Sequence, residues 1–139
     1  MSTILVYSDD PDVRERVTSA LGSRPAADLD AVDFIEVSDG PAVLDTVDHA
    51  EADLCILDAE AAPSGGMGLS RQIYNEIANP PPVVLLVARR DDRWLASWSM
   101  AEAIVTHPID PADLTATVVR LLRARAVTVA AVAPAADSH

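Results

Sequence analysis

The stretch LCILDAEAAPSGGMG, residues 54–68, decides the fold class of this chain of 139 residues. Four apolar residues lead directly into Asp58, and a loop of small residues then precedes a helical pattern. A short apolar run bounded by turn residues predicts a buried strand. A carboxylate at the tip of such a strand has to be stabilised by something, because burial disfavours its charged form.

Strand and helix patterns alternate on both sides of this stretch. The predicted strands cover residues 3–8, 32–40, 52–59, 83–88 and 103–109, and the predicted helices cover residues 10–23, 41–50, 68–78, 91–103 and 110–126. The strand VVLLVA is apolar on both faces, as in the centre of a parallel sheet with helices on both sides. The pattern therefore predicts an α/β fold of three layers, an open five-stranded parallel sheet with helices on both faces.

The chain reads as one domain with a short tail. Residues 1–124 are expected to form the domain, with Asp10 and Asp110 capping the first and last helices. Residues 125–139 carry few packing cues, so we expect this tail to be partly disordered or to form an extended arm.

The composition limits the class of function. Hydrophobic residues make up 50% of the chain, which is ample for a core, and the formal net charge is -12. Such acidity argues against direct binding to nucleic acid. The single cysteine, Cys55, allows no internal disulfide and is expected to be a small buried hydrophobe. With no signal sequence and no apolar run of roughly 18 residues, we expect a cytoplasmic protein that does not bind membranes.

The residues at the carboxyl ends of four predicted strands are candidates for a functional site. They are Ser8, Asp9 and Asp10 after the first strand, Asp58 after the third, Val87 after the fourth and His107 after the fifth. The carboxyl ends of parallel strands meet at one edge of a sheet, so these side chains should converge. Converging acids repel one another unless a hard cation such as Mg²⁺ neutralises them. A carboxylate beside Mg²⁺ can attack a phosphoryl group.

The alternating layout and these strand ends resemble the receiver domain of bacterial two-component response regulators over residues 4–123. The resemblance implies the fold of the chemotaxis single-domain regulator. It also implies that Asp58 accepts a phosphoryl group from a histidine kinase. The Mg²⁺ ligands that it implies are Asp9, Asp58 and the backbone carbonyl of Glu60.

The acid pair of the family can be placed in two registers. Placing Pro11 and Arg14 on family landmarks puts Ser8 on the first acid and Asp9 on the second, and we prefer this register. A shift by one residue restores an acid pair, Asp9 and Asp10, but loses both landmarks. In the first register Asp10 could compensate for Ser8 if its loop turns inward.

Three further positions depart from the family pattern. Val87, before Ala88, replaces the usual threonine or serine, His107, before Pro108, replaces the usual lysine, and Ile104 replaces an aromatic residue. Val87 has no hydroxyl to donate, and such a bond to a charged group is worth roughly 1.5–3 kcal/mol. Histidine lacks the fixed charge of lysine. The pattern therefore predicts an atypical receiver with a weak, degenerate switch.

Two functional readings remain open, and a third is disfavoured. The first is a stand-alone receiver that signals through a downstream protein target, with weak phosphorylation at Asp58. The second is a phosphorylation-independent adaptor whose site is vestigial. An aspartate-nucleophile phosphatase is disfavoured because the end of the first strand lacks the required pair of acids two residues apart, so we expect no enzymatic activity.

A contact surface is suggested by the resemblance. In receivers the fourth helix, fifth strand and fifth helix form the usual face for dimers and targets. Trp94, Trp98 and Ile104 fall on these elements, so this face could bind a target or form a homodimer. Packing of both tryptophans in the core fits the sequence equally well.

Overall fold

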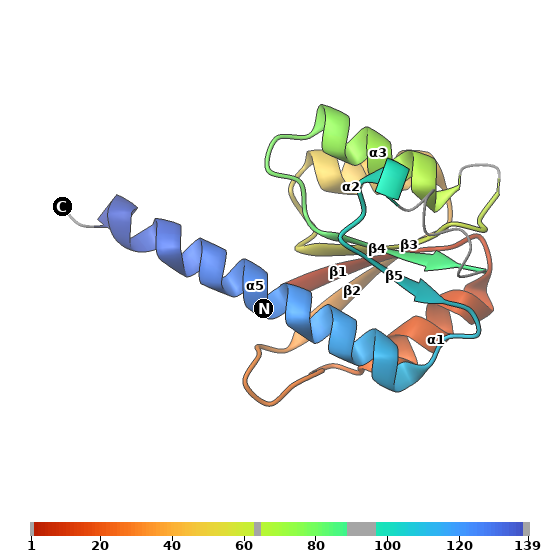
Figure 1. Cartoon of the computed structure of the whole chain (residues 1–139), viewed down its shortest axis with the longest axis horizontal. Coiled ribbons are helices and arrows are strands. Elements are labelled where there is room, and N and C mark those ends of the chain that lie inside the picture. The colour runs from red at the N-terminus through yellow and green to blue at the C-terminus, as the bar shows by residue number, and fades with distance from the viewer. Residues whose placement is uncertain (1, 63–64, 89–96, 138–139) are drawn as a thin grey trace.

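A five-stranded parallel sheet with helices on both faces forms the domain (Figure 1). The computed structural model describes residues 2–62, 65–88 and 97–137. Its elements are β1 (Ser2–Tyr7), α1 (Pro11–Leu21), β2 (Val32–Val37), α2 (Gly40–Asp48), β3 (Leu54–Asp58), α3 (Gly66–Glu76), β4 (Val83–Val87), β5 (Ala103–Thr106) and α5 (Pro111–Asp137). The strand order is β2-β1-β3-β4-β5. The predicted fold class is confirmed.

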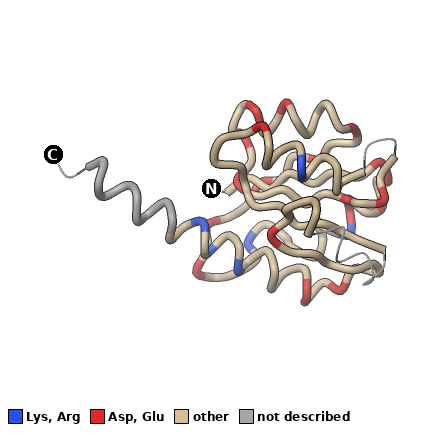
Figure 2. The backbone as a smooth tube through the Cα atoms, turned by 45° about the horizontal axis from the view of Figure 1, so that its top comes forward, with Lys and Arg blue, Asp and Glu red and all other residues tan. Residues whose placement is uncertain are grey.

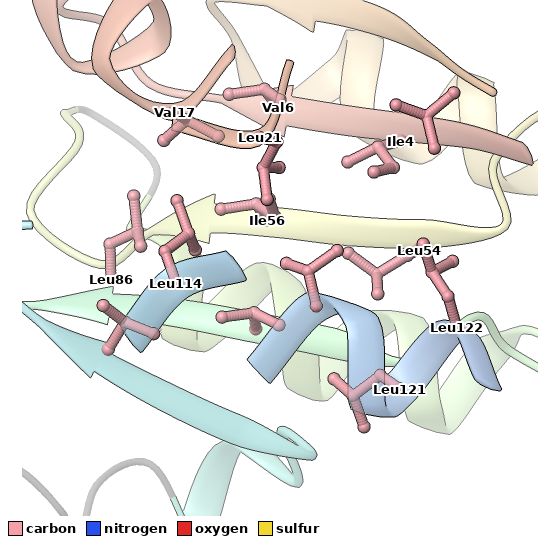
Figure 3. Packing of buried hydrophobic residues seen from close by; sticks show 14 residues of the cluster. Ile4, Val6, Val17, Leu21, Leu54, Ile56, Leu86, Leu114, Leu121 and Leu122 are labelled. Atoms are coloured by element: carbon pink, nitrogen blue, oxygen red, sulfur yellow. The ribbon is translucent and has the colours of Figure 1, made fainter. Parts of the chain in front are cut away.

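Two hydrophobic cores lie on opposite faces of the sheet because side chains alternate along each strand. On β1, Ile4 and Val6 join the core under α1 and α5, whereas Leu5 and Tyr7 join the core under α2 and α3. Figure 3 shows the first core, where leucines of α1 and α5 meet the strands. Burying an aliphatic side chain completely stabilises the fold by about 1.5–3 kcal/mol relative to leaving it exposed. The apolar residues on both faces of the sheet therefore hold a layer of helices on each side.

Aspartates begin three of the helices. Asp10 accepts a hydrogen bond from the Asp12 N–H at 2.9 Å, and Asp110 accepts one from the Ala112 N–H at 2.9 Å. Asp39 caps α2 in the same manner. Each cap satisfies a backbone N–H that has no partner inside its helix. The two caps predicted at Asp10 and Asp110 are confirmed.

The C-terminal tail differs from the sequence expectation. α5 continues to Asp137 as a helix, and Figure 1 shows it projecting beyond the sheet, whereas the sequence favoured a partly disordered tail or an extended arm over residues 125–139. Six of the eleven residues from 126 to 136 are alanine, and neither glycine nor proline occurs between 112 and 133. Alanine is the strongest helix former, so local propensity favours continuing the helix as far as Pro134 without packing cues.

Several smaller expectations can be checked against the described residues. Most of the predicted fourth helix, residues 91–103, lies outside them, while residues 97–99 are helical. Cys55 is buried, and burial raises the pKa of its thiol to about 12. No helix in the described ranges has the length and apolar character needed to cross a bilayer. Figure 2 shows how few positions are basic and how widely acidic positions are spread.

Candidate functional site

Ser8 and Asp58 lie beside each other at the carboxyl edge of the sheet. Tyr7 of β1 pairs with Leu57 of β3, so the next residue on each strand meets its counterpart. The Ser8 Oγ donates a hydrogen bond of 2.8 Å to the Asp58 Oδ2. Ser8 is fully buried and Asp58 is 3% exposed. This pair lies where the strand order reverses, between β1 and β3, the usual ligand-binding point of an open α/β sheet.

The other carboxylate oxygen of Asp58 faces two different groups. The Glu60 N–H donates to the Asp58 Oδ1 at 2.9 Å. The His107 Nε2 lies 3.7 Å from the same oxygen and forms an ion pair with it when the imidazole is protonated. His107 directly follows β5, and its backbone N–H donates a hydrogen bond of 2.8 Å to the backbone carbonyl of Val87. A hydroxyl, an amide and an imidazole therefore surround the buried carboxylate.

Val87 closes the β4 side of the site without a polar group. It is the last residue of β4, pairs with Thr106 of β5 and has no exposed surface. It belongs to the core under α2 and α3. The end of β4 is therefore apolar and tightly packed beside the site.

The two acids that follow Ser8 are more exposed than Asp58. Asp9 and Asp10 are both exposed, and the Asp10 carboxylate caps α1 instead of turning toward Asp58. The pKa of Tyr7 is raised, first by burial and then by the negative charges of Asp9, Asp58 and Asp39. The fields of three carboxylates therefore meet at this edge of the sheet.

The donor set fits a hard cation only weakly. Asp58 is buried and the field at this edge is negative, which favours a cation. However, Ser8 offers a neutral hydroxyl and no negative charge, and it donates its proton to Asp58. Within the described ranges, no group of three or more His, Cys, Asp or Glu side chains is arranged to hold a metal.

One glycine of the stretch 65–68 has a packing role that the sequence did not indicate. Gly66 is buried at the start of α3, and a Cβ there would lie 2.9 Å from the Asp58 carbonyl carbon and oxygen. Only a hydrogen at this position allows α3 to approach the end of β3. Gly66 therefore helps to place the backbone of Asp58.

We predict that Gly66→Ala lowers the free energy of unfolding by about 1–3 kcal/mol, because main-chain atoms of Asp58 cannot move aside cheaply. The matched control is Gly68→Ala, two residues further along α3, where a Cβ would meet nothing within 4 Å. That change should stabilise the protein by about 0.5–1 kcal/mol through helix propensity. Urea unfolding measures both variants. Equal stability of the two would contradict this role of Gly66.

Arg14 is a second residue whose contacts the sequence did not specify. Its Nη1 donates to the Ser8 carbonyl at 2.6 Å, and its Nε lies 3.5 Å from a Glu36 carboxylate oxygen. Arg14 thereby joins α1 to the end of β1 and to β2. The guanidinium of Arg14 therefore contacts the Ser8 carbonyl and the Glu36 carboxylate, and it holds the backbone of Ser8 in place.

The proposed contact face is described only in part. Trp94 lies outside the described residues. Trp98 is 49% exposed, with the Arg71 guanidinium 4.7 Å from the centre of its ring. Ile104 of β5 is partly buried against the core under α2 and α3, and Met100 nearby is 47% exposed. Trp98 therefore lies at the surface and not in the core.

Comparisons with known proteins identify the family of this chain. A search against family models finds no match. An uncharacterized response regulatory protein of Mycobacterium tuberculosis, found in two strains, is 53% identical over 123 residues, which are 88% of this chain and 92% of the relative. The chain belongs to the response regulator receiver family.

Solved structures agree on the fold. The receiver domain of a Francisella response regulator matches with a TM-score of 0.75 at 18% identity, covering 88% of this chain and 98% of that one. A chemotaxis response regulator of Vibrio cholerae matches with a TM-score of 0.70 at 19% identity, covering 87% and 98%. Receiver domains act in two-component signalling, where they interact with histidine kinases and output proteins, and they are typically signalling modules and not enzymes.

Proposed function

We propose that this chain is a stand-alone receiver in phosphorelay signalling and that Asp58 is its phosphoacceptor. One observation supports the role of Asp58 above the others. Its buried carboxylate lies at the point where the strand order reverses, with donors on both oxygens. A carboxylate in that place is a nucleophile held in one orientation, as phosphoryl transfer requires.

The transfer uses one oxygen of Asp58. That oxygen forms a bond to phosphorus while the bond from phosphorus to the donor's leaving group breaks, and the leaving group keeps the electron pair. The Glu60 N–H and a protonated His107 lie close enough to Asp58 Oδ1 to face the negative charge that spreads over the phosphoryl oxygens. The product is an aspartyl phosphate.

Magnesium would be held by Asp9, Asp58 and the backbone carbonyl of Glu60. When bound, it would neutralise charge on the transferring phosphoryl group. Asp10 contributes little in this proposal because its carboxylate caps α1. With Ser8 in place of an acid, one negative charge is missing from the cation's surroundings, so we propose weak binding.

The switch is proposed to be weak because two of its usual parts are replaced. Val87 cannot donate a hydrogen bond to the phosphoryl group, and His107 supplies a charge only when protonated. Losing a charged hydrogen bond of roughly 1.5–3 kcal/mol reduces the shift in a two-state equilibrium by about one to two decades.

Output is proposed to pass through protein contacts in the cytoplasm. A sensor histidine kinase would supply the phosphoryl group, and a downstream protein would bind the face carrying Trp98 and Ile104, which could also form a homodimer. The half-exposed ring of Trp98 supports this face. The net charge of -12 supports a protein target over nucleic acid. We propose no enzymatic activity of its own.

A phosphorylation-independent adaptor is the second candidate. The replacements at Ser8, Val87 and His107 favour it, because each removes a part that phosphoryl signalling normally uses. The two candidates differ in how the partner responds: an adaptor binds equally well when Asp58 is replaced by asparagine.

Intact-mass measurement tests the proposed function. We expect incubation with acetyl phosphate and Mg²⁺ to add the mass of one phosphoryl group to a fraction of the chains, and Asp58→Asn to abolish the addition. The matched control is Asp53→Asn, which changes an acid near the opposite end of β3. An unchanged mass, or an equal increase in Asp58→Asn, would show that Asp58 is not the acceptor.

A further inference from the structure

The Ser8 hydroxyl is committed to two partners inside the protein. It has no exposed surface, its proton goes to the Asp58 Oδ2 at 2.8 Å, and its oxygen accepts the Asp10 N–H at 3.0 Å. A hydroxyl has a single proton to donate, so donation to Asp58 fixes its orientation. Its oxygen therefore faces Asp10 in a defined direction.

The side-chain hydroxyl and the backbone carbonyl of Ser8 both accept hydrogen bonds from residues at the start of α1. Asp10, which donates to the Ser8 hydroxyl, is the residue that caps α1 through the Asp12 N–H. Arg14, one turn into α1, donates to the Ser8 carbonyl at 2.6 Å. A change at the Ser8 side chain would therefore reach the start of α1 through direct hydrogen bonds.

On the opposite side of Asp58, the described residues of β4 bring no hydroxyl to the carboxylate. β3 has two neighbours in the sheet, β1 and β4. At the end of β4, Val87 is buried among apolar residues and has no hydroxyl. Of the two neighbouring strands, it is β1 that brings a hydroxyl into contact with the Asp58 carboxylate.

We propose that Ser8 is a positioning residue that transmits the phosphorylation state of Asp58 to the N-terminal turn of α1, in place of the hydroxyl missing at Val87. The inference rests on the proposed function of Asp58 and specifies how that site regulates the fold. It places the response of this protein on the β1–α1 side of the sheet.

Phosphorylation at either oxygen of Asp58 changes the hydrogen bond of Ser8. If Oδ2 bonds to phosphorus, it becomes a poor acceptor and the Ser8 proton turns toward a phosphoryl oxygen. If Oδ1 bonds to phosphorus, Oδ2 becomes a neutral carbonyl oxygen, and bonds to neutral acceptors are roughly half as strong as those to charged ones. In the first case the Ser8 hydroxyl, which accepts the Asp10 N–H, changes its orientation. In the second case it is held less strongly by Asp58.

Amide NMR of the full chain tests this. With acetyl phosphate and Mg²⁺, we expect the Asp10 amide resonance of the wild type to shift. In the fraction of Ser8→Ala that gains the phosphoryl mass, the Asp10 shift should fall below half of its wild-type size. Ser70→Ala is the matched control, because Ser70 is equally buried but donates to the Ser99 carbonyl at 3.0 Å. It should retain the full shift at Asp10.

The outcomes separate the two proposals. No added mass in the wild type overturns the proposed function and the role of Ser8 with it. Added mass with an undiminished Asp10 shift in Ser8→Ala overturns the role of Ser8 alone.

Hydrogen exchange in the wild type provides a second test if Ser8→Ala does not fold or gains no phosphoryl mass. Phosphodonor should change the exchange rate of the Asp10 amide at least threefold. The Ala42 amide, which is bonded to the capping Asp39 at 2.8 Å, should not respond. Equal responses of the two amides would overturn the role of Ser8.

Discussion

Replacing Val87 with threonine is expected to enlarge the stabilisation that phosphorylation confers by about 1.5–3 kcal/mol, a ten- to hundredfold change in the switching equilibrium. The added hydroxyl would donate to a phosphoryl oxygen on Asp58, which the valine methyl cannot do. Without phosphate, the same hydroxyl is buried at a fully enclosed position and should cost about 1–3 kcal/mol of stability. The two effects have opposite signs and are therefore separable.

Urea unfolding with and without beryllofluoride and Mg²⁺, a stable mimic of the phosphoryl group, measures both effects. Val83→Thr is the matched control. Val83 lies at the other end of the same strand, is equally buried and belongs to the same core. It should lose stability like Val87→Thr but gain nothing from the mimic. An equal gain in the two variants would show that the hydroxyl does not act at Asp58.

Leu114→Ala is expected to lower the free energy of unfolding by about 2–5 kcal/mol, the range for large-to-small changes in a packed core. Leu114 is fully buried and projects from α5 into the core under α1 and α5, near Leu86 of β4 (Figure 3). Its removal leaves a cavity between α5 and the sheet. Urea or thermal unfolding of the variant and the wild type gives the difference.

Val127→Ala on the same helix supplies the control. Val127 is 70% exposed and lies on the part of α5 that continues past the predicted domain boundary. Its replacement should change stability by no more than about 0.5 kcal/mol. A loss as large as that of Leu114→Ala would mean that the distal part of α5 contributes to the fold, against the proposal of a domain that ends near residue 124.

Local patterns in the sequence were enough for the strands, most helices and the family. An apolar run such as residues 83–87 can be recognised from consecutive residues of the sequence. The caps at Asp10 and Asp110 can be recognised in the same way, because each aspartate bonds to an N–H two residues further along. The position of Asp58 at the end of a buried strand is also a local property. The sequence expectation for the C-terminal tail differs from the helix of α5 because it took the absence of hydrophobic periodicity as the absence of a helix. Alanine forms helices without that periodicity.

Contacts between distant residues could not be predicted in this way. The sequence placed Ser8 on the first acid of the family pattern, but gave no sign that its hydroxyl would bond to Asp58, fifty positions along the chain. Likewise, the glycines of residues 65–68 look interchangeable in the sequence. They differ because α3 crosses the backbone of Asp58 at Gly66 and not at Gly68.

The amino-acid sequence by itself determined a parallel α/β sheet with a carboxylate at the tip of its third strand, since periodicity and capping act over a few residues. The tertiary structure alone decided which groups surround that carboxylate. Strand order puts β1 beside β3, and their register brings Ser8 level with Asp58. Both follow from how whole elements pack against one another, because the free energy of burying a strand face depends on its neighbours across the sheet.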